Sequence, residues 1–553
     1  MAKPFPPISQ RVDDLGNIDT NPAIQLFGRR FFSDQTIPEL LLELLLVATS
    51  EKLIGKTEID RDSLLPSLAQ LLSWPIGAPL EYAPKARLNL KLFAFLGSSK
   101  LNTRHDSHKQ HYRDLIDSML DPKHLSISGT MDATEVLRTL ENLFLGFQSV
   151  SRQRTWCAVS FLPVAKELIA GESIWQETKA KAKREGIKDW DEALDYFSHN
   201  QQSFLARGGE LLYLQMCNAL RQDASTTRAW MTESSISTSQ TEGDSQSLHS
   251  ALTEAFATLF EACPDTVGKL AEFLDARVEG KTAEHTDFKS GQLRYAKCGW
   301  CPEESWREGI LFAIEFVRIC SALVDPVERL EQLEVLCALQ VLRSLCAQSA
   351  RYTSQPGGEQ NGAGPLGYVW VISEPAGRHP AIKQISRRNV DAVQRMIYDA
   401  VRHPDIRNSP NLAGKDDASI SKIYTSADSG YGYKLFLSLG KRLGLIVPKR
   451  GAGARFVLNE KLLRCLVMST VRPGQRITYD SFKKLLFAHY GLAVDDASIV
   501  RSCLWSGTSR LSTVGGHSDS WLIEMLNASG MLIRLSDSCS LVTNPFGGAG
   551  GSL

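Results

Sequence analysis

Apolar residues in the first 223 positions recur mostly at the spacing of amphipathic helices. Segments such as IPELLLELLLVA (37–48) and GGELLYLQMCNAL (208–220) place apolar residues three and four positions apart, which gathers them on one face of a helix. The same pattern returns in residues 251–352, where Asp325-Pro326 separates two long helical segments and predicts an antiparallel helical hairpin. The hydrophobic pattern therefore predicts a mainly α-helical protein.

Two polar stretches interrupt this pattern and predict domain boundaries. Residues 224–250 are rich in Ser and Thr, and residues 353–367 are rich in Gly and polar side chains. Neither composition can bury a core, so a linker or long loop is expected at each. The last seven residues, GGAGGSL, are typical of a linker added for expression. The predicted division is a helical domain at 1–223, a linker at 224–250, a helical domain at 251–352, a linker at 353–367, two further domains at 368–465 and 466–546, and a terminal linker at 547–553.

Beyond residue 367 the pattern changes to short strands mixed with helices. YVWVIS (368–373) is β-branched and aromatic, which predicts a strand. In LGKRLGLIVPKRGAGARFVL (439–458), a helix end is followed by Gly444, an apolar strand, a glycine-rich turn and a second strand. SWLIEMLNASGMLIRLSDSCSLVTNPF (520–546) repeats this order around Gly530. The two copies predict two successive small domains of one type.

A helix, a glycine and a two-stranded hairpin resemble the C-terminal half of a winged helix-turn-helix domain. The resemblance implies that helix 431–443 is the third helix of the motif and lies against the major groove. The hairpin 447–457 would then be the wing that reaches the phosphates or the minor groove. The candidate DNA contacts are Lys434, Lys441, Arg442, Lys449, Arg450 and Arg455. The second copy carries acidic residues in these elements, so we expect it to pack or to bind protein.

The charge distribution agrees with a polyanion-binding surface in the C-terminal third. The chain of 553 residues holds 62 Lys and Arg and 62 Asp and Glu. Residues 367–546 alone hold 24 basic against 14 acidic residues, so the remainder is net acidic. A local basic excess favours nucleic-acid binding, whereas the acidic remainder is expected to contact other proteins.

The composition is that of a soluble protein from a reducing compartment. Hydrophobic residues make up 43% of the chain, no apolar run is long enough to span a membrane, and the N-terminus lacks the pattern of a secretory signal. Most of the 11 cysteines lie within apolar helical patterns, which is typical of buried thiols and not of a disulfide framework. We therefore expect a cytoplasmic location and no membrane contact.

Patterns that would carry catalysis or hold a metal are few. Cys298 and Cys301 of CGWC form a CxxC that could be half of a zinc site, a redox pair or two buried thiols, because tetrahedral zinc needs two further ligands. His105, His108 and His111 recur every three residues and form either a metal-binding face or a plain polar helix face. Protease, hydrolase and nucleotide-binding motifs are missing, so we expect no catalytic residues, no cofactor and no enzymatic activity.

The segment NPAIQLFGRRFFSDQTIPELLLELLLVATSEK (21–52) resembles the N-terminal regions of large helical accessory proteins from bacterial anti-phage defence operons. This resemblance implies a place beside other subunits such as an ATPase, a helicase or a nuclease. The chain is thus predicted to be a DNA-binding accessory subunit of a multi-protein complex. The alternative is an assembly scaffold that binds only protein and makes no direct contact with DNA.

Overall fold

The computed structural model of this chain describes residues 3–7, 21–29, 31–60, 63–97, 105–120, 132–150, 155–183, 186–198, 208–236, 243–261, 265–275, 295–353, 362–407, 412, 414–507, 519–536 and 539–547. Helices dominate these residues, and the strands among them form small sheets of two to four strands. The prediction of a mainly α-helical protein is therefore confirmed.

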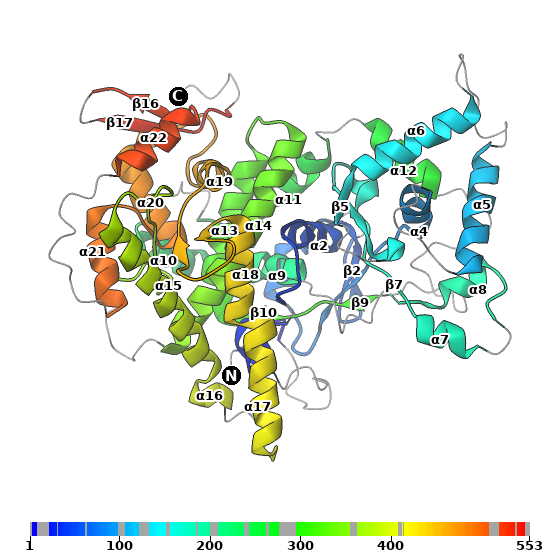
Figure 1. Cartoon of the computed structure of the whole chain (residues 1–553), viewed down its shortest axis with the longest axis horizontal. Coiled ribbons are helices and arrows are strands. Elements are labelled where there is room, and N and C mark those ends of the chain that lie inside the picture. Colours follow the sequence, from blue (N-terminus) through cyan, green and yellow to red (C-terminus); the bar gives the residue numbers. More distant parts are fainter. Residues whose placement is uncertain are drawn as a thin grey trace.

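Four long helices form the centre of the molecule (Figure 1). Glycines allow them to pack closely: a methyl group on Gly209 would collide with the backbone oxygen of Leu40, and one on Gly309 with that of Gln215. Every residue of the helix at 208–220 is buried. The helices at 306–320 and 326–353 form the antiparallel hairpin predicted around Asp325-Pro326. The four are α2 (Ile37–Thr49), α9 (Gly208–Leu220), α13 (Trp306–Cys320) and α14 (Pro326–Thr353).

Helices and short strands from the N-terminal half surround one side of this centre. A four-stranded antiparallel sheet, ordered β3-β2-β4-β9, lies between α2 and a side lobe of helices on the right of Figure 1. The sheet strands are β2 (Glu51–Ile54), β3 (Thr57–Glu58), β4 (Leu80–Ala83) and β9 (Ala296–Lys297). The lobe contains α4 (Leu88–Lys91), α5 (Asp106–Leu120), α6 (Ala133–Gly146), α7 (Glu177–Ala182), α8 (Trp190–Leu194) and α12 (Asp265–Asp275). Smaller elements are α1 (Pro22–Phe27), α3 (Leu68–Leu72), and the strand pairs β1 (Pro4–Phe5) with β10 (Cys301–Pro302), β5 (Gln148–Val150) with β6 (Ser160–Phe161), and β7 (Ile174–Trp175) with β8 (Phe197–Ser198).

The prediction of a linker or long loop at residues 224–250 is wrong for most of the residues of this stretch that the structure describes. Residues 224–233 form α10 (Ala224–Glu233), capped by Asp223, and α11 (Ser245–Glu261) begins before residue 250. A few large side chains outweigh the polar composition: Trp230 packs edge-on against Trp306 with ring centroids 5.5 Å apart. Phe256 of α11 packs against Phe316 of α13 at 4.8 Å. Most of the Ser and Thr residues in these helices are exposed or half-buried, so residues 224–233 and 245–250 are helical despite their composition.

The C-terminal region contains the two predicted copies of helix, glycine and hairpin, on the left of Figure 1. Gly444 and Gly530 have left-handed φ angles of 79° and 70°, as the sequence predicts for residues that end helices. The first copy comprises β11 (Trp370–Val371), α15 (Pro380–Val401), α16 (Pro404–Arg407), α17 (Asp417–Ser426), α18 (Tyr433–Leu443), β12 (Ile446–Val447) and β13 (Arg455–Phe456). The second comprises α19 (Glu460–Thr470), β14 (Arg476–Thr478), α20 (Tyr479–Tyr490), β15 (Leu492–Ala493), α21 (Asp496–Trp505), α22 (Ser520–Ala528), β16 (Leu532–Arg534) and β17 (Ser540–Thr543). Strand β11 pairs in parallel with β15, which joins the two copies. Of the other predicted linkers, residues 354–361 and 548–553 lie outside the described residues.

A fully buried polar network ties this region to the central helices. Arg343 of α14 donates from Nη1 and Nη2 to the two carboxylate oxygens of Glu315 on α13, at 2.8 and 2.7 Å. Arg343 Nη1 also donates to the backbone oxygen of His489 on α20 at 3.0 Å, and His489 Nδ1 lies 2.8 Å from Glu315 Oε1. Gln340 extends the network to Gln215 of α9. Burial alone would raise the pKa of Glu315, but the charge of Arg343 and the hydrogen bonds hold it below its usual value.

We expect Arg343→Met to lower the free energy of unfolding by about 3–5 kcal/mol, because it leaves the Glu315 carboxylate buried without its counter-charge. The double variant Arg343→Met/Glu315→Leu removes both charges and should recover most of this loss. Urea denaturation followed by circular dichroism measures both. A double variant as unstable as the single variant would show that the ion pair is not the source of the effect.

Candidate nucleic-acid interface

The structure contains the helix and the hairpin that the sequence predicts at 431–443 and 447–457, as α18 and the β12–β13 pair. Their apolar residues are buried against the rest of the protein. Leu435, Phe436 and Leu439 of α18 are buried, and α18 packs on α14. In the hairpin, Phe456 pairs with Ile446 and stacks on Trp370 with ring centroids 5.8 Å apart. The alternation of apolar and basic residues along 433–456 therefore has a structural cause: one side anchors the unit, and the other carries the charges.

Arg455, one of the six predicted DNA contacts, is buried inside the protein. Its guanidinium donates to Ser373 Oγ at 2.6 Å and to the backbone oxygens of Glu374 and Pro375 at 3.0 and 2.9 Å. Burial lowers the pKa of Arg455, and the nearby Arg387 adds to this effect. Arg455 thus links β13, the second strand of the hairpin, to the segment between β11 and α15 through hydrogen bonds.

Arg442 is likewise engaged by the protein, at a contact between α18 and the N-terminal half. Its guanidinium donates to the backbone oxygens of Ser33 (2.7 Å) and Gln35 and to Ser438 Oγ (2.6 Å). Beside it, Phe32 packs edge-on against Tyr431 with ring centroids 4.9 Å apart. Residues 32–35 therefore cover part of the helix that the sequence predicts to lie in the major groove.

The other four predicted contacts keep their charges on the surface. Lys449 and Arg450 lie at the exposed turn of the hairpin. Lys434 is exposed on α18, and Lys441, about two helical turns further along, is half-exposed. None of the four side chains forms a hydrogen bond or ion pair with the described residues.

Sequence reasoning did not assign α15 to this site, but the structure packs α15 against the hairpin strand β13. A methyl group on Gly453, in the hairpin turn, would lie 3.2 Å from Arg387 Nη2, so the Arg387 guanidinium covers the turn. Lys383 lies one helical turn before Arg387, and Arg388 is exposed next to it. Lys383 and Arg387 are spaced i, i+4, and like charges at this spacing destabilise a helix when no anion neutralises them. This spacing is the sequence signal that could have identified Lys383 and Arg387. We call Lys383, Arg387, Arg388, Lys449 and Arg450 the wing–helix basic surface.

The cysteine candidates for a metal or redox site are buried thiols. Cys301 lies on β10, and burial raises the pKa of its thiol to about 12. A thiol that stays protonated at neutral pH is a poor nucleophile. Cys298 is also buried, and the amide between the two, that of Gly299, donates to Glu210 Oε2 at 3.0 Å. All described cysteines except Cys539 are buried, as the sequence predicts, and no disulfide joins the described cysteines.

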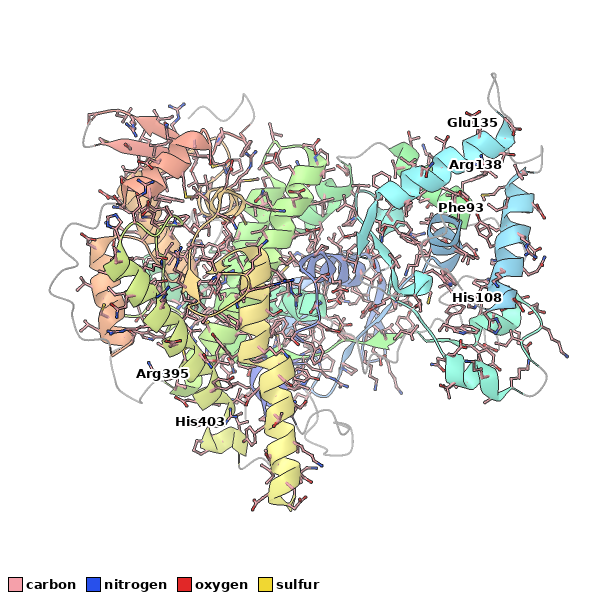
Figure 2. All side chains as sticks on the ribbon, viewed as in Figure 1. Phe93, His108, Glu135, Arg138, Arg395 and His403 are labelled. Carbon is pink, nitrogen blue, oxygen red and sulfur yellow. The ribbon has the colours of Figure 1, made fainter. Side chains whose placement is uncertain are left out.

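The histidine candidates belong to an aromatic cluster in the side lobe (Figure 2). The ring of His108 lies 4.3 Å from that of Trp175 and 5.3 Å from that of Phe197, and His111 stacks on Trp190 at 4.0 Å. His105 packs on Trp175 at 4.8 Å. His105 Nδ1 lies 2.6 Å from Ser107 Oγ, and His111 Nε2 lies 2.9 Å from Asn89 Oδ1, so hydrogen bonds within the protein already use these ring nitrogens. Within the described ranges, no group of three or more His, Cys, Asp or Glu side chains is arranged to hold a metal ion.

Comparison with known proteins gives no relative: no protein-family model, curated protein or solved structure matches the chain. Among the helices that the structure describes, none combines the length and the apolar character needed to cross a membrane.

The aromatic cluster predicts a pH-dependent stability. Burial, reinforced by His105 and His111, lowers the pKa of His108 to about 3, whereas an unfolded histidine titrates near pH 6.5. Between these values the unfolded chain binds the proton and the folded chain does not, so stability falls as pH drops below about 6.5. We expect His108→Phe, which keeps an aromatic ring in the cluster, to reduce the loss of unfolding free energy between pH 7 and 5 by up to about 2 kcal/mol. Urea denaturation at both pH values is the measurement, and an unchanged pH dependence would contradict the assignment.

Proposed function

We propose that the protein is a non-enzymatic DNA-binding subunit that contacts phosphates through the wing–helix basic surface. The observation that carries this proposal is the set of five cations contributed by α15 and the hairpin turn. None of their side chains has a hydrogen-bond or ion-pair partner among the described residues. Gathering like charges on one surface is unfavourable unless a polyanion neutralises them. The closely spaced phosphates of DNA supply such a partner, and binding releases the counter-ions condensed on them.

The arrangement favours contacts to the DNA backbone over reading of base edges. A winged helix that reads sequence inserts its third helix into the major groove. Here α18 is packed on α14, and its Arg442 is held by Ser33 and Gln35. Lys434 and Lys441 of α18 remain accessible, and the hairpin turn and α15 supply the other accessible basic residues of this region. The proposal therefore includes little sequence preference and a steep dependence on salt concentration.

The rival function is a scaffold that binds only protein. The contact of α18 with the N-terminal half favours it, because this contact uses winged-helix elements to hold two parts of one chain together. On this alternative the basic surface would dock an acidic protein. The proposal also includes a role in anti-phage defence and a partner such as an ATPase, a helicase or a nuclease. Both rest only on the resemblance of residues 21–52.

Removing the charges at the hairpin turn tests the proposal directly. We expect Lys449→Gln/Arg450→Gln to weaken binding to a duplex at least roughly fivefold near physiological salt, and to reduce the slope of log affinity against log salt by about 2. Fluorescence anisotropy with a labelled duplex at several salt concentrations measures both.

The matched control is Arg138→Gln/Lys179→Gln, which removes the same net charge. Both residues are exposed in the side lobe, and Figure 2 shows Arg138 at the opposite end of the molecule from α15. This control should leave the affinity and the salt slope close to those of the unaltered protein. Equal losses in the two double variants would mean that net charge, and not this surface, drives the binding. No duplex binding at any salt concentration would favour the scaffold.

Arg442→Gln separates backbone contact from major-groove reading. We expect it to lower the free energy of unfolding by about 1 kcal/mol, because hydrogen bonds from a charged donor to Ser33 and Gln35 are lost, and to leave duplex affinity unchanged. Denaturation and anisotropy on the same preparations provide the two values. A loss of affinity without a loss of stability would show instead that α18 contacts DNA.

A further inference from the structure

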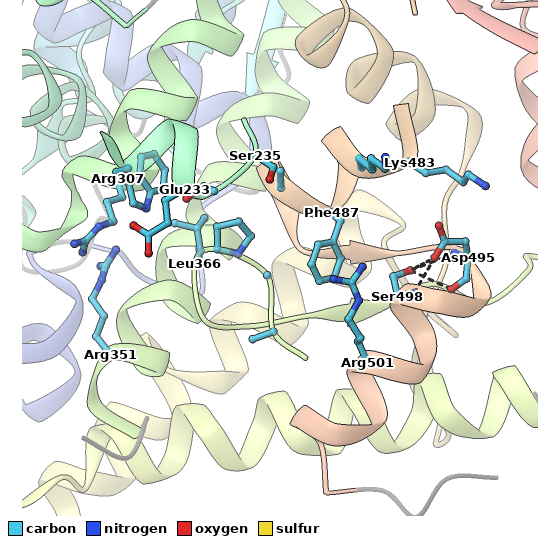
Figure 3. A pocket seen from close by; sticks show the side chains of 17 residues that line it. Glu233, Ser235, Arg307, Arg351, Leu366, Lys483, Phe487, Asp495, Ser498 and Arg501 are labelled. Carbon is cyan, nitrogen blue, oxygen red and sulfur yellow. Dashed lines mark hydrogen bonds between the residues drawn. The ribbon is translucent and has the colours of Figure 1, made fainter. Parts of the chain in front are cut away.

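A large cavity lies between the central helices and the second C-terminal copy, away from the wing–helix basic surface (Figure 3). Its volume is about 810 Å³, within the range of about 300–1,000 Å³ that is typical of small-molecule sites. One wall is formed by α10, α13 and α14, and the opposite wall by α20 and α21. Residues 363–366 form the floor between them.

Positive charge dominates the lining of this cavity. Five basic side chains line it against two acidic ones, Glu233 and Asp495. Two of the cations are neutralised within the protein: Arg351 pairs with Glu308, and Lys483 lies 3.1 Å from carboxylate oxygens of both Asp480 and Asp519.

Three cations of the lining have no such partner. Arg307, Lys484 and Arg501 form neither a hydrogen bond nor an ion pair with the described residues. Arg307 is half-buried, and burial together with the nearby Arg351 lowers its pKa. Glu308, Glu233 and Glu304 act on Arg307 in the opposite direction, but none of them forms an ion pair with it. Lys484 and Arg501 are exposed. The lining therefore carries more basic than acidic side chains, and three of the basic ones are available to an anion.

Aromatic rings hold two of these guanidinium groups in place. The Arg307 Cζ lies 4.9 Å from the ring centroid of Trp306, and the Arg501 Cζ lies 5.2 Å from that of Phe487. Figure 3 shows Arg307 and Arg501 on opposite sides of the cavity, with Phe487 beside Arg501. Trp230 also lines the cavity on the Arg307 side. Each end of the cavity thus combines an aromatic ring with an oriented guanidinium.

We propose that this cavity binds a phosphorylated small molecule of nucleotide size. Guanidinium groups bind phosphate oxygens through paired, charge-assisted hydrogen bonds, and a phosphate chain would neutralise Arg307, Lys484 or Arg501. The rings of Trp230 and Phe487 provide faces on which a planar base can stack. Glu233, exposed at the end of α10, can accept a hydrogen bond from an amino group of that base. The cavity is formed by other elements than the wing–helix basic surface. The proposal of nucleotide binding can therefore fail while the proposal of DNA binding holds, and the reverse.

The test is isothermal titration of the full chain with ATP and with tripolyphosphate, both in EDTA so that no divalent metal contributes. We expect ATP to bind with a dissociation constant below about 1 mM and tripolyphosphate to bind at least roughly tenfold more weakly, because it lacks the base. Arg307→Gln and Arg501→Gln should each weaken ATP binding about tenfold or more. Arg138→Gln, in the side lobe, is the charge-matched control and should bind ATP like the unaltered chain.

A second variant fills the cavity without altering any charge. Ala363→Trp adds a large side chain to the lining and should also weaken ATP binding about tenfold, which keeps the proposal testable if an arginine variant does not fold. The proposal is overturned if ATP gives no heat at about 1 mM, or if the cavity variants bind ATP as tightly as Arg138→Gln does. Equal affinity for tripolyphosphate and ATP would also overturn it, since no base would then be recognised. Duplex affinity should be unchanged in all three cavity variants.

Discussion

The buried ion pair between Arg343 and Glu315 is the interaction on which the arrangement of the two halves depends. Both side chains are fully excluded from solvent, so each charge must be satisfied by the other or by neighbouring polar groups. The hydrogen bonds that complete this requirement reach α9 through Gln340 and α20 through His489. A shift of α20 relative to α13 and α14 would deprive Arg343 and Glu315 of their hydrogen bonds to His489. The network therefore selects one placement of the C-terminal region, and with it the position of the hairpin and of both cavity walls.

Around this fixed junction the basic residues of the C-terminal third divide into two groups. Arg442 and Arg455 donate to backbone oxygens and hold the structure together. The residues of the wing–helix basic surface form no hydrogen bond or ion pair with the residues that the structure describes, and the same holds for three cations of the cavity lining, Arg307, Lys484 and Arg501. Arginine suits both tasks, because its planar group of donors binds carbonyls, carboxylates and phosphates equally well. A basic composition alone therefore does not separate structural from functional cations, and only the partners of each side chain do so.

The two unneutralised groups of cations differ in shape, and this difference separates the proposed ligands. The hairpin turn and α15 carry mostly exposed cations, which suits an extended polyanion. The cavity between α10 and α21 is concave, partly desolvated and lined by aromatic rings, which suits a small anion with a planar ring. The cavity wall spans the same junction that the ion pair stabilises. A ligand bound there would contact both halves of the chain at once.

Local patterns in the sequence determined the helices, the central hairpin around Asp325-Pro326, the left-handed glycines at 444 and 530 and the buried thiols. These features depend on periodicity, backbone sterics and side-chain polarity, which act over a few residues. The helical state of residues 224–233 was not predictable in this way, because the packing of Trp230 on Trp306 and the burial of Met231 outweigh their polar composition. Likewise, the burial of Arg455, the docking of Arg442 on residues 33–35 and the aromatic cluster around His108 join segments far apart in the chain. Only the tertiary structure decides which charges meet a partner, since that depends on distances through space that no local pattern encodes.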